Sequence, residues 1–258
     1  MSKTSIRLTH PWPLSWQNHQ VFLGPFMPFL ARFSTTKSWP LVSDYDVPDN
    51  MNFVLQDDMG QRKRRRLKKE LQRQGLSFLD IYVQNIIEKK KILTRQNNWH
   101  DFFNMLIWAH FPKSKWALHK AFFASRQEVQ SQVLQRSSFE DLLTCFDEGS
   151  LLLLCREANY SSLMQALSCR DLSRKNSLLT DFSLKHLVFG HGLLESLCAG
   201  KRDLNVLTML VPLKEEMFSW DLPEIIAKFL DDYLWHNLLK NLKSEQIFSF
   251  PVGAVFSR

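Results

Sequence analysis

Three separated segments of the chain carry residue types that transfer protons or bind metals. They are residues 94–104, with His100, Asp101 and Asn104; residues 141–148, with Asp141, Thr144, Asp147 and Glu148; and residues 189–195, with His191 and Glu195. Imidazole nitrogens and carboxylate oxygens are common ligands of divalent transition metals. The same groups act as general acids and bases when water hydrolyses a substrate. If the fold brings the segments together, the sequence predicts a cleft enzyme of metal-assisted or acid–base hydrolase type.

We expect two overlapping roles within these segments. The catalytic candidates are His100, Asp101, Asn104, His191 and Glu195. The candidate ligands of a divalent metal, the one cofactor that these residue types suggest, are Asp147, Glu148 and His191. The chain has no His-Glu-x-x-His motif, nucleophile elbow, P-loop or dinucleotide fingerprint, so the reaction and the substrate stay open. The alternative is a buried polar network that holds helices together without catalysis.

The first segment is unusual because it is polar without being charged. From Gln96 to Pro112 the only formally charged side chain is Asp101, in a chain that is 23% charged. A helix with one face in solvent normally carries Lys, Glu and Arg there, so we expect both faces of this helix to be covered. A buried carboxylate has to be paired. Its partner is either Arg95 or a group from one of the other two segments.

The third segment combines a one-turn spacing with two glycines. His191 and Glu195 are four residues apart, which places them on one face of a helix, and we predict that helix over residues 182–199. Gly190 and Gly192 would each cost about 1 kcal/mol inside it relative to Ala. Such a cost indicates close approach of another backbone or a ligand. The simpler interpretation is that His191 and Glu195 only stabilise the helix, and that Asp147 and Glu148 form a solvated turn.

The elements that position these segments are predicted to be mainly helical, as an α+β fold with a small β element. Residues 1–50 are rich in Pro and aromatic residues, and we expect an irregular strap with buried rings. Residues 51–258 are expected to form one globular domain. Hydrophobic periodicity and turn residues predict strands at 52–55 and 151–155, a turn at 147–150, an irregular tail at 248–256, and helices at 62–74, 77–91, 97–112, 115–135, 139–146, 161–168, 182–199 and 220–242.

The positive charge of the chain is concentrated in one run. Residues 62–69 hold seven basic side chains and no acid, which equals the whole net charge of +7. One interpretation is an anion-binding surface for a partner such as RNA, through Arg62, Arg64, Arg65 and Arg66. The other is a solvated helix face. Because the run contains no aromatic residue for base stacking, the sequence favours the solvated face.

The remaining composition indicates a protein of a reducing compartment. The four cysteines form no Cys-x-x-Cys pair and lie among apolar neighbours, so we expect buried free thiols: Cys145, Cys155, Cys169 and Cys198. Prolines interrupt the apolar N-terminal stretch, which therefore does not resemble a secretory signal. No stretch is long and apolar enough to span a bilayer. These observations predict a cytoplasmic protein.

The same residues resemble the pattern of a bacterial family known as domain-of-unknown-function family 3025. The resemblance rests on five stretches that occur in the order of the family's pattern. They are Tyr82, the stretch Thr-Arg-Gln-Asn-Asn-Trp-His-Asp-Phe-Phe-Asn at residues 94–104, the Trp-x-x-Phe-Pro-x-x-Lys pattern of residues 108–115, the Thr-x-Phe-Asp-Glu pattern of residues 144–148, and Phe-Gly-His-x-Leu-Leu-Glu at residues 189–195. It covers residues 82–200 and does not include the basic run. It implies an intracellular bacterial protein and implies no activity.

Overall fold

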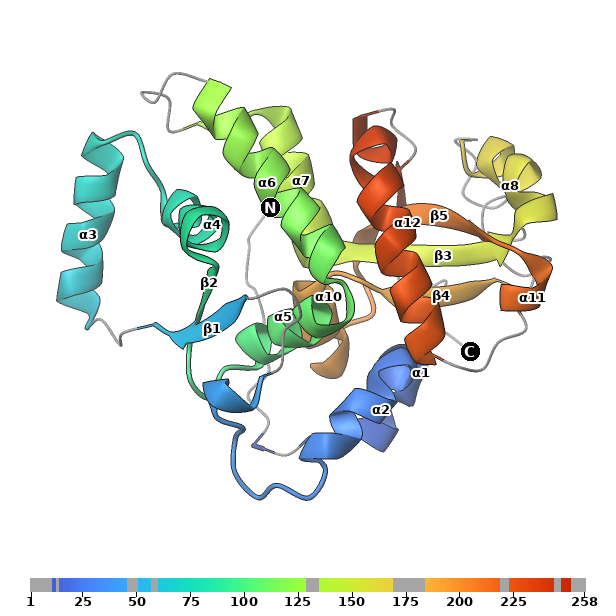
Figure 1. Ribbon diagram of the computed structural model, residues 1–258, viewed down its shortest axis with the longest axis horizontal. Helices are drawn as coiled ribbons and strands as arrows, with labels where there is room; N and C mark the ends of the chain where they lie inside the picture. Colours follow the sequence, from blue (N-terminus) through green and yellow to red (C-terminus); the bar gives the residue numbers. More distant parts are fainter. Residues whose placement is uncertain are drawn as a thin grey trace.

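The computed structural model describes residues 11–12, 14–45, 51–56, 60–128, 135–168, 184–218, 223–243 and 247–251. It is predominantly helical with two small sheets, which confirms the predicted fold class (Figure 1). In this part of the chain no helix combines the length and the apolar character needed to cross a membrane.

The larger sheet has four strands in the order β4 (Lys185–Val188), β3 (Ser150–Arg156), β5 (Asn205–Leu213) and β6 (Ile247–Pro251). Strand β3 pairs in parallel with β5, and the two outer strands are antiparallel to their neighbours. The predicted strand at 151–155 is confirmed, and its side chains are all buried. A strand that is covered on both faces shows no alternation of apolar and polar residues, which is why the sequence of β3 is a continuous apolar run.

Two predictions in the second half of the chain are wrong because sheet pairing overrides local pattern. Residues 182–199 are not one helix: β4 is followed by a break and then by α10 (His191–Cys198). The amides of Phe189 and Gly190 both donate to the Ser150 carbonyl oxygen, at 3.1 and 2.9 Å. Residues 248–251, predicted as part of an irregular tail, belong to the edge strand β6. Residues 182–183 and 252–256 lie outside the described residues, and β5 was not predicted at all.

The helices that carry the first two polar segments begin with side-chain caps. Helix α5 (Trp99–His110) starts after Asn98, whose side-chain oxygen accepts from the Asp101 amide at 3.1 Å. Nine of its twelve residues are buried, as the lack of charge indicated. Helix α7 (Ser138–Gly149) begins with a capping box at Ser137 and runs directly into β3. The turn predicted at 147–150 is therefore wrong, and Asp147 and Glu148 lie in the last turn of α7.

The remaining elements lie on both sides of α5 and α7, with α3 at one end of the molecule and α8 and α11 at the other (Figure 1). A two-stranded parallel sheet joins β1 (Asn52–Leu55) to β2 (Lys91–Thr94), which confirms the predicted strand at 52–55. The other helices after residue 60 are α3 (Gln61–Arg73), α4 (Phe78–Lys89), α6 (Pro112–Glu128), α8 (Tyr160–Leu167), α11 (Glu215–Phe218) and α12 (Pro223–Lys243). Helix α6 already starts at Pro112, because proline is well tolerated in the first turn of a helix. The predicted extension of α6 over 129–134 lies outside the described residues.

The N-terminal segment is a series of short helical turns rather than an irregular strap. These turns are the 3-10 helices Trp16–His19, Gly24–Phe26, Ala31–Phe33 and Val42–Asp44, with α1 (Gln20–Leu23) and α2 (Met27–Leu30) between them. Prolines lie in the first turn of two of them, where no backbone hydrogen bond is lost. The prediction of buried rings is confirmed at Trp16, whose ring stacks on Phe102 of α5 with centroids 5.8 Å apart.

The cysteine prediction is confirmed in part. Cys155 and Cys198 are buried free thiols, and burial raises the pKa of Cys155 to about 12. Cys145 is exposed, contrary to the prediction, because it faces outward from α7. Cys169 lies outside the described residues.

Candidate metal centre

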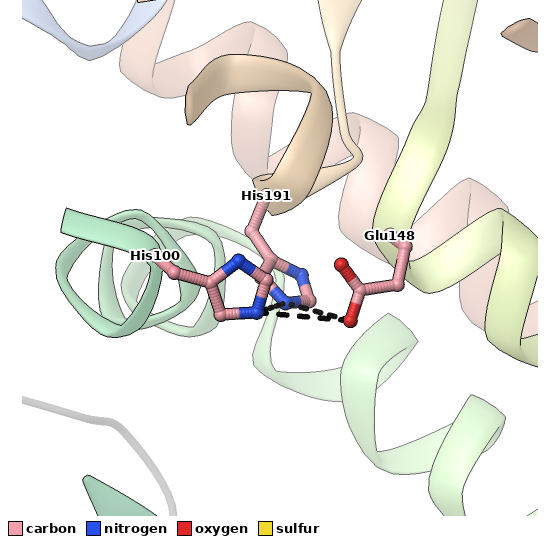
Figure 2. Close-up of side chains that lie close together, drawn as sticks. All are labelled: His100, Glu148 and His191. Carbon is pink, nitrogen blue, oxygen red and sulfur yellow. Dashed lines mark hydrogen bonds and ion pairs between the residues drawn. The ribbon is translucent and has the colours of Figure 1, made fainter. Parts of the chain in front are cut away.

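Three side chains from three different helices meet at one point (Figure 2). The Nε2 atoms of His100 on α5 and His191 on α10 are 3.2 Å apart. One carboxylate oxygen of Glu148 on α7, Oε1, lies 3.5 Å from Nε2 of His191 and 3.7 Å from Nε2 of His100. The fold thus joins the three segments that the sequence singled out.

The ring of His100 is oriented by a carboxylate behind it. Its Nδ1 lies 3.1 Å from Oε2 of Glu195, and an ionised carboxylate only accepts hydrogen bonds, so Nδ1 carries the proton. Burial opposes protonation of the ring, but the hydrogen bond to Glu195 and the nearby Glu148 outweigh burial and raise the pKa of His100. In the neutral ring, Nε2 therefore presents its lone pair to His191 and Glu148.

The ring of His191 is oriented in the same way by a backbone group. Its Nδ1 lies 2.9 Å from the carbonyl oxygen of Asp147, which also only accepts, so Nδ1 donates and Nε2 carries the lone pair. His191 is the first residue of α10, and only 5% of its side chain is exposed. Its Nε2 consequently has a fixed direction, towards His100.

The tautomers leave three acceptors facing one another. With both Nδ1 atoms donating, the two Nε2 lone pairs and the Glu148 oxygen converge without a hydrogen atom between them. Such an arrangement is repulsive unless a cation lies among the acceptors. That cation is either a proton on one of the rings or a metal ion, and the three donor atoms all lie within 4.8 Å of one another, as a shared metal requires.

Glu148 provides the only formal negative charge of the three. Burial alone would raise the pKa of its carboxyl group. When the rings are protonated, the charge of His191, a hydrogen bond from His191 and the charge of His100 outweigh burial and lower that pKa to about 2. The carboxylate is therefore ionised at neutral pH. Its side chain is 45% exposed and that of His100 is 29% exposed, so water reaches the cluster from this side.

The two glycines of the third segment allow α10 to contact the end of α7. A Cβ on Gly190 would lie 2.4 Å from the Ser150 nitrogen and 2.6 Å from the Glu148 carbonyl oxygen. A Cβ on Gly192 would lie 2.6 Å from Oε2 of Glu148. The predicted close approach of a backbone is confirmed, although the glycines lie at the start of α10 rather than inside a longer helix.

The comparison with protein families gives one match. The family described as "Protein of unknown function (DUF3025)" matches residues 71–255. The chain belongs to this family. The match is wider than residues 82–200, where the sequence pattern was recognised, and it still starts after the basic run. No curated protein and no solved structure matches the chain significantly.

In this DUF3025 member, Asp147 forms an ion pair with a buried lysine that was not among the predicted site residues. Nζ of Lys115 donates to Oδ1 of Asp147, and the Lys115 side chain is 0% exposed. Burial raises the pKa of Asp147, but Lys115 and His191 outweigh it and hold that pKa well below its usual range. Asp147 was predicted as a metal ligand; its carboxylate contacts Lys115, and its carbonyl oxygen orients His191. The one feature of the sequence that could have identified Lys115 as a site residue is its position at the end of the Trp-x-x-Phe-Pro-x-x-Lys pattern of residues 108–115.

Asp101 and Asn104, predicted as catalytic, have partners away from the three donor atoms. The guanidinium group of Arg95 donates through Nε and Nη2 to both carboxylate oxygens of Asp101, at 2.9 and 2.8 Å. Nδ2 of Asn104 donates to the Tyr82 hydroxyl at 2.9 Å. The open question about Asp101 is therefore answered in favour of Arg95. Asp101 holds the start of α5, and Asn104 joins the middle of α5 to α4.

The first residues of the second segment lie on the outer side of α7. Asp141 is 57% exposed and forms an ion pair with Arg136 at 3.1 Å. Thr144 donates to the Glu140 carbonyl oxygen at 2.8 Å. Of that segment, only Glu148 places a side-chain oxygen among the Nε2 atoms.

Proposed function

We propose that this DUF3025 member binds a divalent metal ion through Nε2 of His100, Nε2 of His191 and a carboxylate oxygen of Glu148, and that it is a metal-dependent hydrolase. The observation that supports this most strongly is the pair of Nε2 lone pairs aimed at each other and at a carboxylate. Each ring is fixed by a separate acceptor on Nδ1, as is usual for histidines that bind metals.

The spacing of the donor atoms favours zinc. With metal–ligand bonds of about 2.1 Å, a tetrahedral ion holds its ligands about 3.4 Å apart and an octahedral ion holds neighbouring ligands about 3.0 Å apart. The three separations of 3.2, 3.5 and 3.7 Å scatter around the tetrahedral value. Two histidines and one glutamate, with a water in the fourth position, form a common ligand set of catalytic zinc.

The chemistry of such a centre is activation of water. A bound zinc ion lowers the pKa of its water ligand to about 7, which supplies hydroxide at neutral pH. The exposed side of the cluster, at His100 and Glu148, is where water and a substrate carbonyl or phosphoryl group would reach the ion. Glu195 and the Asp147 carbonyl would hold the two rings in place around a bound ion.

Replacing Glu195 with Gln tests the support of His100. We expect zinc affinity to fall by about 10- to 100-fold, because loss of the charge behind a metal-bound histidine weakens that ligand. Competition titration against a chromophoric chelator measures the affinity. The matched control is Glu215→Gln, a change at a glutamate that is 72% exposed and pairs with Arg156. Equal zinc affinity in Glu195→Gln and the wild type would contradict the role of Glu195.

The alternative for the same three residues is a shared proton, with His100 and Glu148 acting in acid–base catalysis or only in structure. The raised pKa of His100 supports this alternative. The two hypotheses differ in the metal content that they predict for the purified protein.

A second candidate function rests on α3. Its basic residues are exposed, and Leu71 is its buried residue. The helix lies at the edge of the molecule (Figure 1), and its one acidic residue, Glu70, pairs with Arg73 outside the run. We propose RNA as the anionic partner of this helix, with phosphate contacts from Arg62, Arg64, Arg65 and Arg66.

Salt dependence tests the RNA proposal. The triple change of Arg64, Arg65 and Arg66 to Ala should reduce the slope of log affinity against log salt by about 2 for a single-stranded RNA, since three phosphate contacts are lost. Fluorescence anisotropy with a labelled oligonucleotide measures the affinity. A charge-matched control replaces Lys228, Lys240 and Lys243 on α12 with Ala. The proposal fails if both triple variants lower the affinity and the slope equally.

A further inference from the structure

A separate hollow lies where α4, α6 and α12 meet. Its volume is about 480 Å³, and its lining residues include Lys90, Trp108, Lys113, Trp116, Asp232, Trp235 and His236. Pockets for small molecules usually have volumes of about 300–1,000 Å³. None of the lining residues belongs to the His100, Glu148 and His191 cluster, so this is a second place at which the protein could hold a ligand.

Aromatic rings give the hollow flat walls. Trp108 is fully buried behind it, and Trp116 lies on α6. Trp235 on α12 is 40% exposed, which makes it one of the few large apolar residues that are exposed rather than partly buried among the described residues. A large exposed indole at the edge of a pocket is a suitable surface for stacking of a planar ring.

Lys90 supplies a positive charge from an unfavourable backbone position. It is the C-cap of α4 with φ 56° and ψ 33°, a left-handed conformation that normally favours glycine. Its Nζ lies 3.3 Å from the centre of the Trp116 ring. Backbone strain of this kind is often found at functional sites. The side chain therefore has a use here that glycine would not provide.

The charge balance of the hollow favours an anion. Lys113 and Asp232 form an ion pair with each other, so their charges cancel. In the part of the chain that the structure describes, no ion pair joins Lys90 to a carboxylate, and its ammonium group is balanced only by the Trp116 ring. His236 adds a further hydrogen-bond donor or acceptor to the lining. A ligand with one anionic group would complete the charge balance.

We propose that this hollow is a binding site for a nucleotide-type ligand, a planar aromatic ring that carries a phosphate. The ring stacks on Trp235, and the phosphate contacts the ammonium group of Lys90. The site is independent of the proposed metal, because it shares no residue with the metal cluster.

Calorimetric titration with adenosine monophosphate tests the proposal on the full-length protein. We expect binding by the wild type, and at least tenfold weaker binding by Lys90→Gly and by Trp235→Ala. Lys89→Ala removes the same charge from the exposed last residue of α4 and should bind as the wild type does. Adenosine and inorganic phosphate, titrated separately, should each bind at least tenfold more weakly than the nucleotide.

The Lys90→Gly variant separates binding from folding. Because glycine suits the left-handed position, its melting temperature should not fall below that of the wild type. Absence of nucleotide binding by the wild type would overturn the proposal, as would equal binding by Lys90→Gly. Adenosine binding as tightly as the nucleotide would overturn the role of Lys90, and phosphate binding as tightly would overturn the role of Trp235.

Discussion

Replacing Lys115 with Met is expected to lower the free energy of unfolding by about 3–5 kcal/mol, because it leaves Asp147 as an uncompensated charge in the interior. The Lys115 side chain is 0% exposed and that of Asp147 is 14% exposed, so little water can replace the lost partner. Urea denaturation of the two proteins measures the difference. The expected loss of stability does not depend on how much the intact ion pair stabilises the protein. It arises because the carboxylate of Asp147 stays buried without a partner.

A control for this prediction lies two residues earlier on the same helix. Lys113 also pairs with an aspartate, Asp232, but the two side chains are 47% and 46% exposed. Exposed ion pairs contribute about 0–1 kcal/mol, so Lys113→Met should cost no more than about 1 kcal/mol. If the two variants lose similar stability, the described burial of the pair between Lys115 and Asp147 is wrong.

Replacing Gly190 with Ala is expected to cost about 3 kcal/mol or more. Overpacking usually costs about 1–3 kcal/mol, and here the atoms in the way cannot rotate aside. The new Cβ would lie 2.4 Å from the Ser150 nitrogen, and 2.6 Å from both the Glu148 carbonyl oxygen and the Gly149 nitrogen. All three belong to the backbone that joins α7 to β3, so α10 has to move away from α7. Urea denaturation, or the yield of folded protein if the loss is too large, measures the effect.

Gly149 provides the matched control for Gly190. It is the last residue of α7, and a Cβ added there meets nothing within 4 Å. Gly149→Ala should therefore leave the stability unchanged or increase it by about 0.5–1 kcal/mol, through better helix propensity and a less flexible unfolded chain. Equal losses in Gly149→Ala and Gly190→Ala would show that α10 does not contact α7 as described.

Local signals in the sequence predicted the start of the site well. Asn97 and Asn98 both stand where an amide side chain can satisfy a free backbone amide at a helix end, and Asn98 is the residue that caps α5. The absence of charge around Asp101 indicated burial, and two glycines indicated close backbone approach. These predictions succeed because each signal lies within one continuous stretch of the sequence.

The parts that sequence could not predict depend on distant partners. His100 and His191 are 91 residues apart along the chain, and Glu195 pairs with His100 across a similar separation. The local sequence of residues 185–188 predicted a helix, but these residues form a strand because they pair with residues 151–154. Lys115 gave no local signal of burial, since its carboxylate partner lies on another helix.

Metal content is the most direct test of the proposed centre. The wild type, His191→Ala and His186→Ala are expressed with added zinc, purified without chelator and measured by elemental analysis. His186 lies on β4 with its ring against the Val21 carbonyl oxygen, away from the three donor atoms, and serves as the matched histidine control. We predict about one zinc per chain in the wild type and in His186→Ala, and almost none in folded His191→Ala. Equal and negligible metal in all three proteins would contradict the metal centre.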